Sequence, residues 1–126
     1  MVEVLIVDDE ADAREPLGKF LVKAGHAVRH APGGQEALAE VVLKLPDVVL
    51  LDLLMPKISG TDFLAVVRSY RRFRSLPVVV LTGLFDTPEL ERAAKLGVHS
   101  VLLKSKVTFE DIRRAVEDAA RGGAAA

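Results

Sequence analysis

Acidic side chains follow two apolar runs of the sequence at the point where each run stops. Asp8 and Asp9 come directly after "VEVLIV" (2–7), and Asp52 follows "DVVLL" (47–51). Carboxylates at the end of a buried strand repel one another, and they are costly unless a cation neutralises them. Carboxylates, carbonyl oxygens and water are the ligands that Mg²⁺ prefers, and Mn²⁺ accepts them too. The acids therefore predict a divalent-metal site.

Two other apolar runs also stop on a polar side chain. Thr82 follows "PVVVL" (77–81), and Lys104 follows "SVLL" (100–103). A carboxylate beside a dication and a lysine can attack a phosphoryl group in line and form an acyl phosphate. The ammonium group would neutralise charge on the phosphoryl oxygens, and the threonine hydroxyl could donate a hydrogen bond to one of them. Taken singly, each of these residues is an ordinary cap, turn or loop residue. Together they favour phosphoryl transfer to a carboxylate.

The elements that must position these residues alternate along the chain. Apolar runs at 2–7, 26–31, 47–51, 77–81 and 100–103 are separated by amphipathic stretches at 12–24, 34–45, 60–72, 88–97 and 108–121. This alternation predicts an α/β fold with a parallel sheet and helices on both faces. In such a sheet, ligands bind outside the carboxyl ends of the strands. If the strand order is 2-1-3-4-5, the polar residues that end the first, third, fourth and fifth strands meet in one crevice.

The composition fits one domain in a reducing compartment. The chain has 126 residues, half of them hydrophobic, and 17 basic against 18 acidic residues give a net charge of −1. This balance lacks the basic footprint of a nucleic-acid binder. Without cysteine, disulfides and thiolate chemistry are excluded. No signal peptide or run of membrane-spanning length is evident, so a cytoplasmic location is expected. We expect the domain to span 1–121, with 122–126 as a frayed tail or the remnant of a linker.

Four motifs carry a resemblance to a known family. They are "VDDE" (7–10), "LLDLLMPKISG" (50–60), "VVLTG" (79–83), and Lys104 after "VLL". With them, the sequence closely resembles the receiver domain of two-component response regulators from Val2 to about Ala120. The resemblance implies a single flavodoxin-like, doubly wound (βα)5 domain with a five-stranded parallel sheet in the order 2-1-3-4-5.

The resemblance also implies a function and a role for each site residue. The roles are phosphoacceptor and metal ligand for Asp52, metal ligands for Asp8, Asp9 and the backbone carbonyl of Leu54, and contacts to the phosphoryl oxygens for Thr82 and Lys104. The donor would be a phosphohistidine of a sensor histidine kinase or a histidine phosphotransfer protein, in a Mg²⁺-dependent reaction. Phosphorylation would switch the interaction with a downstream protein of unknown identity. Such a domain is a signalling module rather than an enzyme, although it catalyses its own phosphorylation and dephosphorylation.

Two positions depart from the family's pattern. Val101 stands where relatives usually have an aromatic switch residue, and Ser105 stands where they usually have a proline joined by a cis bond. A non-proline cis bond costs about 2.5–4 kcal/mol, so the Lys104–Ser105 bond is predicted to be trans. These departures leave open a receiver-like interaction module that is not phosphorylated.

Two enzymatic or cofactor-binding alternatives fit less well. A flavin site would need a loop rich in glycine and hydroxyl groups where the chain has "DDEADA" (8–13). An aspartyl-phosphate hydrolase would need an acid at the position of Leu54. Leu54 and Leu84 would instead cover the approach of water to a phosphorylated Asp52, so we expect slow loss of the phosphoryl group.

The remaining features of the sequence have ordinary structural interpretations. The run "RSYRRFR" (68–74) resembles a small nucleic-acid patch, but such a run is more often the solvated end of a helix. His26, His30 and His99 lack the spacing of metal ligands and are expected at the surface. We expect no DNA-binding domain and no membrane segment in this chain. The oligomeric state stays open, with a homodimer as one option.

Overall fold

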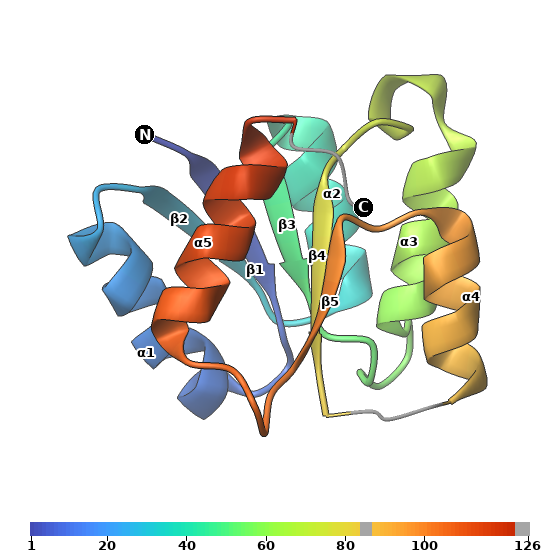
Figure 1. The fold of residues 1–126 in the computed structure, drawn as a ribbon. Helices are drawn as coiled ribbons and strands as arrows, with labels where there is room; N and C mark the ends of the chain where they lie inside the picture. Colours follow the sequence, from blue (N-terminus) through green and yellow to red (C-terminus); the bar gives the residue numbers. More distant parts are fainter. Residues whose placement is uncertain (84–86, 123–126) are drawn as a thin grey trace.

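Five strands and five helices alternate in the structure, as the sequence predicts. The computed structural model of the chain describes residues 1–83 and 87–122. The strands are β1 (Glu3–Val7), β2 (Ala27–Ala31), β3 (Val48–Leu51), β4 (Val78–Thr82) and β5 (Ser100–Leu103). The helices are α1 (Ala11–Lys23), α2 (Gly34–Leu43), α3 (Gly60–Ser69), α4 (Pro88–Leu96) and α5 (Phe109–Ala120), with a short 3-10 helix η1 (Arg71–Phe73) after α3 (Figure 1). No strand boundary departs from its predicted position by more than one residue.

The strands form one parallel sheet in the order β2-β1-β3-β4-β5, which confirms the predicted topology. Because all strands run the same way, their carboxyl ends gather at one edge of the sheet, the lower edge in Figure 1. Strand β3 in the middle of the sheet is buried along its whole length, while β2 and β5 at the edges are more exposed. The residues that follow β1, β3, β4 and β5 are therefore neighbours.

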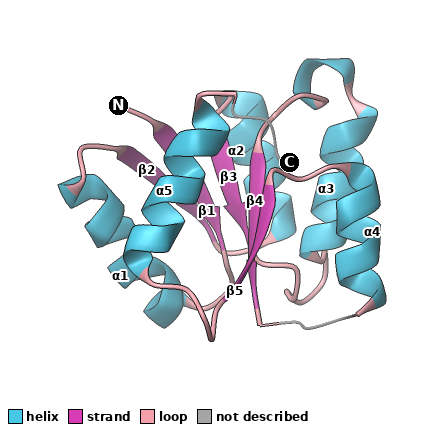
Figure 2. Cartoon of the chain, in the orientation of Figure 1, coloured by secondary structure: helices cyan, strands magenta, loops and turns pink. Residues whose placement is uncertain are grey.

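Helices cover both faces of the sheet in three layers (Figures 1 and 2). Helices α1 and α5 pack on one face, and α2, α3 and α4 pack on the other. The alternation of side chains along a strand divides the core accordingly: Val4 and Ile6 of β1 face α1 and α5, whereas Leu5 and Val7 face the other layer. Full burial of each such side chain contributes roughly 1.5–3 kcal/mol, so the two layers hold the strand ends in fixed positions.

Side-chain caps begin three of the helices. The hydroxyls of Ser59, Thr87 and Thr108 accept hydrogen bonds from backbone N–H groups in the first turns of α3, α4 and α5. Asp111 completes a capping box at α5 by accepting from the Thr108 N–H at 2.9 Å. None of the helices in the described part of the chain is both long enough and apolar enough to cross a bilayer.

Two of the three histidines are not at the surface, contrary to expectation. The side chains of His26 and His99 are only 8% and 12% exposed, because each ring packs against α5 and pairs with a carboxylate there. His26 Nε2 lies 2.7 Å from Glu117 Oε2, and His99 Nε2 lies 2.7 Å from Asp118 Oδ2. His30 is exposed, as predicted.

Candidate functional site

Three carboxylates meet at the carboxyl edge of the sheet. Asp8 and Asp9 follow β1, Asp52 follows β3, and one oxygen from each lies within 4.8 Å of the other two. The neighbouring strands impose this proximity, since the Asp52 N–H donates to the Val7 carbonyl at 3.0 Å. Asp8 and Asp52 are each only 5% exposed, whereas Asp9 is open to solvent. The predicted acidic crevice is therefore present, with one accessible member.

Lys104 supplies a positive charge to this cluster from the end of β5. Its Nζ lies 3.1 Å from Asp8 Oδ2 and 3.4 Å from Asp52 Oδ2. Burial alone would lower the pKa of Lys104, but the hydrogen bond to Asp8 and the charges of both carboxylates outweigh it and raise the pKa above its ordinary value. The ammonium group therefore stays charged at neutral pH. One such charge does not balance three carboxylates.

The Asp52 carboxylate is held in this cluster at an energetic cost. Burial raises its pKa above the ordinary value, and the charge of Asp8 adds to that rise. The charge of Lys104 and the Leu54 N–H, which donates to Asp52 Oδ1 at 3.2 Å, oppose it without cancelling it. A further cation beside Asp52 would stabilise the ionised form.

Thr82 is the last residue of β4 and is fully buried. Its carbonyl accepts a hydrogen bond from the Lys104 N–H at 2.9 Å, which ties the start of the β5–α5 loop to the end of β4. The structure thus places Thr82 beside the backbone of Lys104, as strand order 3-4-5 requires. Leu84, which we expect to restrict the access of water, lies outside the described residues.

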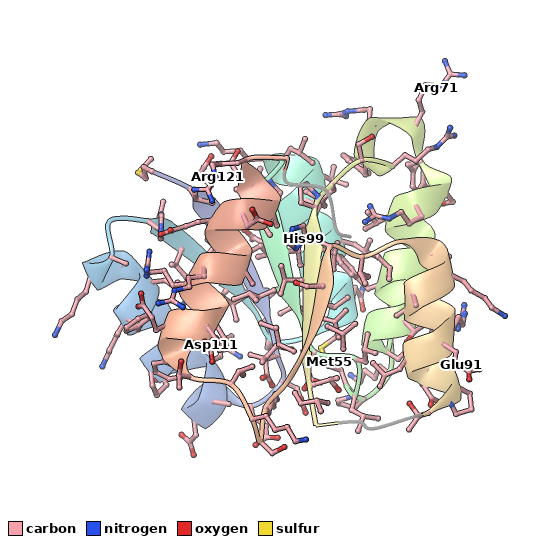
Figure 3. The ribbon with its side chains drawn as sticks, in the orientation of Figure 1. Met55, Arg71, Glu91, His99, Asp111 and Arg121 are labelled. Atoms are coloured by element: carbon pink, nitrogen blue, oxygen red, sulfur yellow. The ribbon has the colours of Figure 1, made fainter. Side chains whose placement is uncertain are left out.

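The loop from β3 to α3 folds back tightly against the backbone of Asp52 and Leu53. The Gly60 N–H donates to the Leu53 carbonyl at 3.0 Å, and a Cβ at position 60 would collide with the backbone of Asp52 and Leu53. A glycine is required here by close approach of two backbone segments. Met55 anchors the same loop in the core near the lower edge of the molecule (Figure 3). The Leu54 side chain points outward and is 56% exposed.

Arg14 in α1 is a site residue that sequence reasoning missed. Its Nη1 donates to the backbone carbonyl of Asp8 at 2.6 Å, and its Nε donates to His30 Nδ1 at 3.2 Å. Burial, followed by the charge of Arg14, lowers the pKa of His30, which keeps this ring a neutral acceptor. Arg14 therefore fixes the turn that carries Asp8 and Asp9. The available signal was its position as the fourth residue of the helix that follows the acid pair.

The two positions that depart from the family's pattern lie on and after β5. Val101 is at the surface of β5, with 39% of its area exposed. Ser105 is exposed in the loop that follows Lys104. No cis peptide bond occurs in residues 1–83 or 87–122, so the trans bond predicted between Lys104 and Ser105 is confirmed.

The donor set fits a hard divalent cation. Asp8, Asp9 and Asp52 offer three carboxylate oxygens at mutual distances that one ion can bridge, and they include no soft ligand. The two buried acids would hold the ion against the sheet, and exposed Asp9 would leave it open to water. The three carboxylates carry more negative charge than Lys104 neutralises, and this excess would attract the cation.

Comparisons with known proteins place this geometry in a family. The family described as response regulator receiver domain matches residues 4–117. A "Probable transcriptional regulator ycf27" of Guillardia theta is 37% identical over 102 residues, which are 81% of this chain and 39% of that protein. A "Probable chemotaxis protein CheY" of Rhizobium etli is 32% identical over 117 residues, covering 92% of this chain and 90% of that protein. The chain thus spans well under half the length of the first relative.

A solved structure agrees with these sequence matches. The response regulator receiver domain protein from Clostridium thermocellum superposes with a TM-score of 0.86 and 29% identity, covering 97% of this chain and 96% of the other. The family match over residues 4–117 includes the strand ends that carry the acids and the lysine. The chain belongs to the response regulator receiver domain family.

Proposed function

We propose that this receiver domain accepts a phosphoryl group on Asp52 and thereby relays a signal. The observation that carries the proposal is the position of Asp52: it is buried, lies within a three-carboxylate cluster and sits 3.4 Å from Lys104 Nζ. A structural aspartate at a strand end does not need two more acids beside it. A nucleophilic carboxylate that works with a metal does.

The chemistry follows from the groups that surround Asp52. A carboxylate oxygen attacks phosphorus in line, the bond from phosphorus to the donor's imidazole nitrogen breaks, and that nitrogen keeps the electron pair. Lys104 exchanges a contact with Asp52 for one with a phosphoryl oxygen, and the Thr82 hydroxyl donates to another. Bound Mg²⁺ or Mn²⁺, held by Asp8, Asp9, Asp52 and the Leu54 carbonyl, would neutralise charge on the transferred group.

The wider role extends this proposal to partners. The donor is a phosphohistidine of a sensor histidine kinase or a histidine phosphotransfer protein, and the product engages a downstream protein in the cytoplasm. Residues 1–121 would form the working unit. The exposed valine at position 101 lacks the aromatic ring of typical relatives, so the output would depend on other movements of the β5 region. This departure is also what favours the second candidate, an interaction module that is not phosphorylated.

Phosphorylation by a small donor separates the two candidates. Incubation with acetyl phosphate and Mg²⁺ is expected to add the mass of one phosphoryl group, stable in acid and labile in base. The Asp52→Asn variant is expected to gain none, and omission of the divalent ion should abolish labelling of the parent. An unlabelled parent under these conditions would favour the interaction module. Equal labelling of the variant would show that another residue is the acceptor.

A further inference from the structure

Charge is distributed unevenly between one segment and the rest of the chain. Four of the 17 basic residues and none of the 18 acidic residues fall within residues 63–85. This segment includes most of α3, together with η1 and β4. The remainder of the chain therefore carries an excess of acids. A local positive surface on a protein of net charge −1 attracts anionic partners to one place rather than to the whole molecule.

Three of these arginines, Arg71, Arg72 and Arg74, form an exposed group that we term the arginine cluster. Within residues 1–83 and 87–122, none of the three forms an ion pair. Arginines elsewhere do so, as Arg29 does with Glu40 and Arg92 with Asp62. Figure 3 shows the Arg71 side chain projecting away from the molecule, at the end opposite Met55 and the acidic site. Among the described residues, the cluster therefore has no compensating acid.

The scaffold beneath the arginine cluster is well fixed. Arg68 donates to the Gly97 carbonyl from Nε and Nη2 and to the Phe73 carbonyl from Nη1, which ties α3, η1 and the α4–β5 loop together. The guanidinium of Arg72 lies 5.3 Å from the centroid of the buried Phe73 ring. A ligand would therefore meet arginines on an ordered support. Binding would then cost less conformational entropy of the protein.

A hollow adjoins the arginine cluster at the amino ends of β4 and β5. It has a volume of about 510 Å³, and its lining includes Arg74, Leu76, Pro77, Leu96, Val98 and His99. Apart from Arg74 and His99 these side chains are apolar. Exposed Tyr70 stands nearby, with its ring 6.1 Å from that of Phe73. The surface thus combines a cationic rim with an apolar recess.

We propose that the arginine cluster and the adjoining hollow bind an acidic peptide segment of a partner protein, one that also carries an apolar side chain. Carboxylates of the segment would pair with the guanidinium groups, which match them in a bidentate geometry. The apolar side chain would enter the hollow. The apolar part of the hollow suits an apolar side chain, which a phosphate backbone does not carry. A peptide is therefore favoured over a nucleic acid.

This surface works independently of phosphoryl transfer. It lies at the amino ends of the strands, whereas Asp52 lies at the carboxyl ends, so a partner bound here leaves the acidic site open. A kinase or phosphotransfer protein could occupy one end while the acidic segment occupies the other. The proposal stands whether or not Asp52 is phosphorylated, and its test uses the unphosphorylated protein.

Fluorescence anisotropy with a designed probe tests the proposal. The probe is a fluorescein-labelled peptide in which single leucines are spaced among glutamates. The triple variant Arg71→Gln, Arg72→Gln, Arg74→Gln is expected to bind it at least about tenfold more weakly than the parent, because charge-assisted pairs are lost. The matched control Lys19→Gln, Lys23→Gln, Lys95→Gln removes the same number of charges from exposed positions on α1 and α4. It should change affinity far less.

Three outcomes would overturn the proposal. Equal binding of the probe to the parent and to the arginine variant would show that the cluster is not the site. Equal loss in both triple variants would show a general effect of net charge. Tighter, arginine-dependent binding of a DNA duplex than of the peptide would assign the surface to nucleic acid instead. A matching thermal unfolding midpoint, followed by circular dichroism, shows that the variants are folded.

Discussion

The two ends of the sheet use charged residues in opposite ways. At the carboxyl end, three carboxylates crowd together, and the ammonium group of Lys104 contacts two of them, Asp8 and Asp52. At the amino end, two acids near the end of α5 have partners in the chain: Glu117 pairs with His26 and Arg113, and Asp118 pairs with His99 and Arg121. Asp47 likewise accepts a backbone hydrogen bond from Glu3 at 2.8 Å.

This difference distinguishes charged residues that stabilise the fold from charged residues that are available to bind a ligand. A charged group whose partner lies in the same chain has its electrostatic cost offset on folding, so its loss should affect stability. A group without such a partner has its cost offset only when something binds, so its loss should affect binding. The acid cluster belongs to the second kind. The histidine–carboxylate pairs belong to the first.

The largest expected effect is on metal binding at the carboxyl end. Asp9→Ala removes an accessible carboxylate of the cluster, so Mn²⁺ affinity should fall by more than about tenfold. Electron paramagnetic resonance of free Mn²⁺, with Mg²⁺ as competitor, measures this directly. Glu10→Ala, which removes the neighbouring acid outside the cluster, is the matched control and should retain most of the affinity. Unchanged affinity in the Asp9 variant would place the metal elsewhere.

At the amino end, the corresponding change should affect stability and leave metal binding intact. His26→Ala removes the pair with Glu117 and the acceptor of the Val2 N–H, 3.1 Å away. Leaving these groups unsatisfied should lower the free energy of unfolding by roughly 1–3 kcal/mol, measured by urea denaturation. His30→Ala, at an exposed position, should cost less. A drop in Mn²⁺ affinity for the His26 variant would break the separation between the two ends.

A smaller effect is expected on the lifetime of the phosphoryl group. The exposed Leu54 side chain lies beside Asp52 and offers no hydrogen bond to an attacking water. Leu54→Asn could orient that water, so the phosphorylated variant should decay severalfold faster than the parent. Leu43→Asn, at an exposed position on α2, is the control. Equal decay of parent and Leu54 variant would show that this position does not limit hydrolysis.

The smallest effect is a pH dependence of the metal-free protein. The raised pKa of Asp52 means that the folded state binds more protons than the unfolded state above the ordinary pKa of 3.8. The free energy of unfolding therefore falls as the pH rises from 3.8 through the pKa that Asp52 has in the folded protein. Asparagine does not titrate, so the Asp52→Asn variant does not lose stability in this way as the pH rises. In EDTA, the variant should be more stable than the parent at neutral pH and gain nothing at pH values below the ordinary pKa.

Local patterns were enough to predict most of the fold and the site. Valine-rich strands, helical periodicity and residue types at strand ends depend on neighbours in sequence, so the parallel sheet and the polar residues Asp8, Asp52 and Lys104 at its strand ends were accessible. The strand order that brings them together followed from the resemblance to the receiver family. The pairs His26–Glu117 and Arg14–His30 were not accessible. They join residues 91 and 16 positions apart, and no local signal reports which side chains a packed helix brings together.

Gly60 shows what a sequence motif leaves unexplained. Its place in the "LLDLLMPKISG" motif was visible, but the reason for it was not. Only the fold reveals that a side chain there would strike the backbone of Asp52 and Leu53. A motif thus indicated a required residue, and packing explains the requirement.

If the unbalanced acids at the carboxyl end serve a phosphoryl group on Asp52, reductive mapping of the phosphorylated protein will locate that group at position 52. Protein labelled with acetyl phosphate and Mg²⁺ is treated with borohydride, which converts an aspartyl phosphate to homoserine, and the peptides are then sequenced by mass spectrometry. We predict homoserine at position 52 and aspartate at positions 8 and 9. Homoserine at either of those two positions, or at none of the three in protein that has gained a phosphoryl group, would contradict the account.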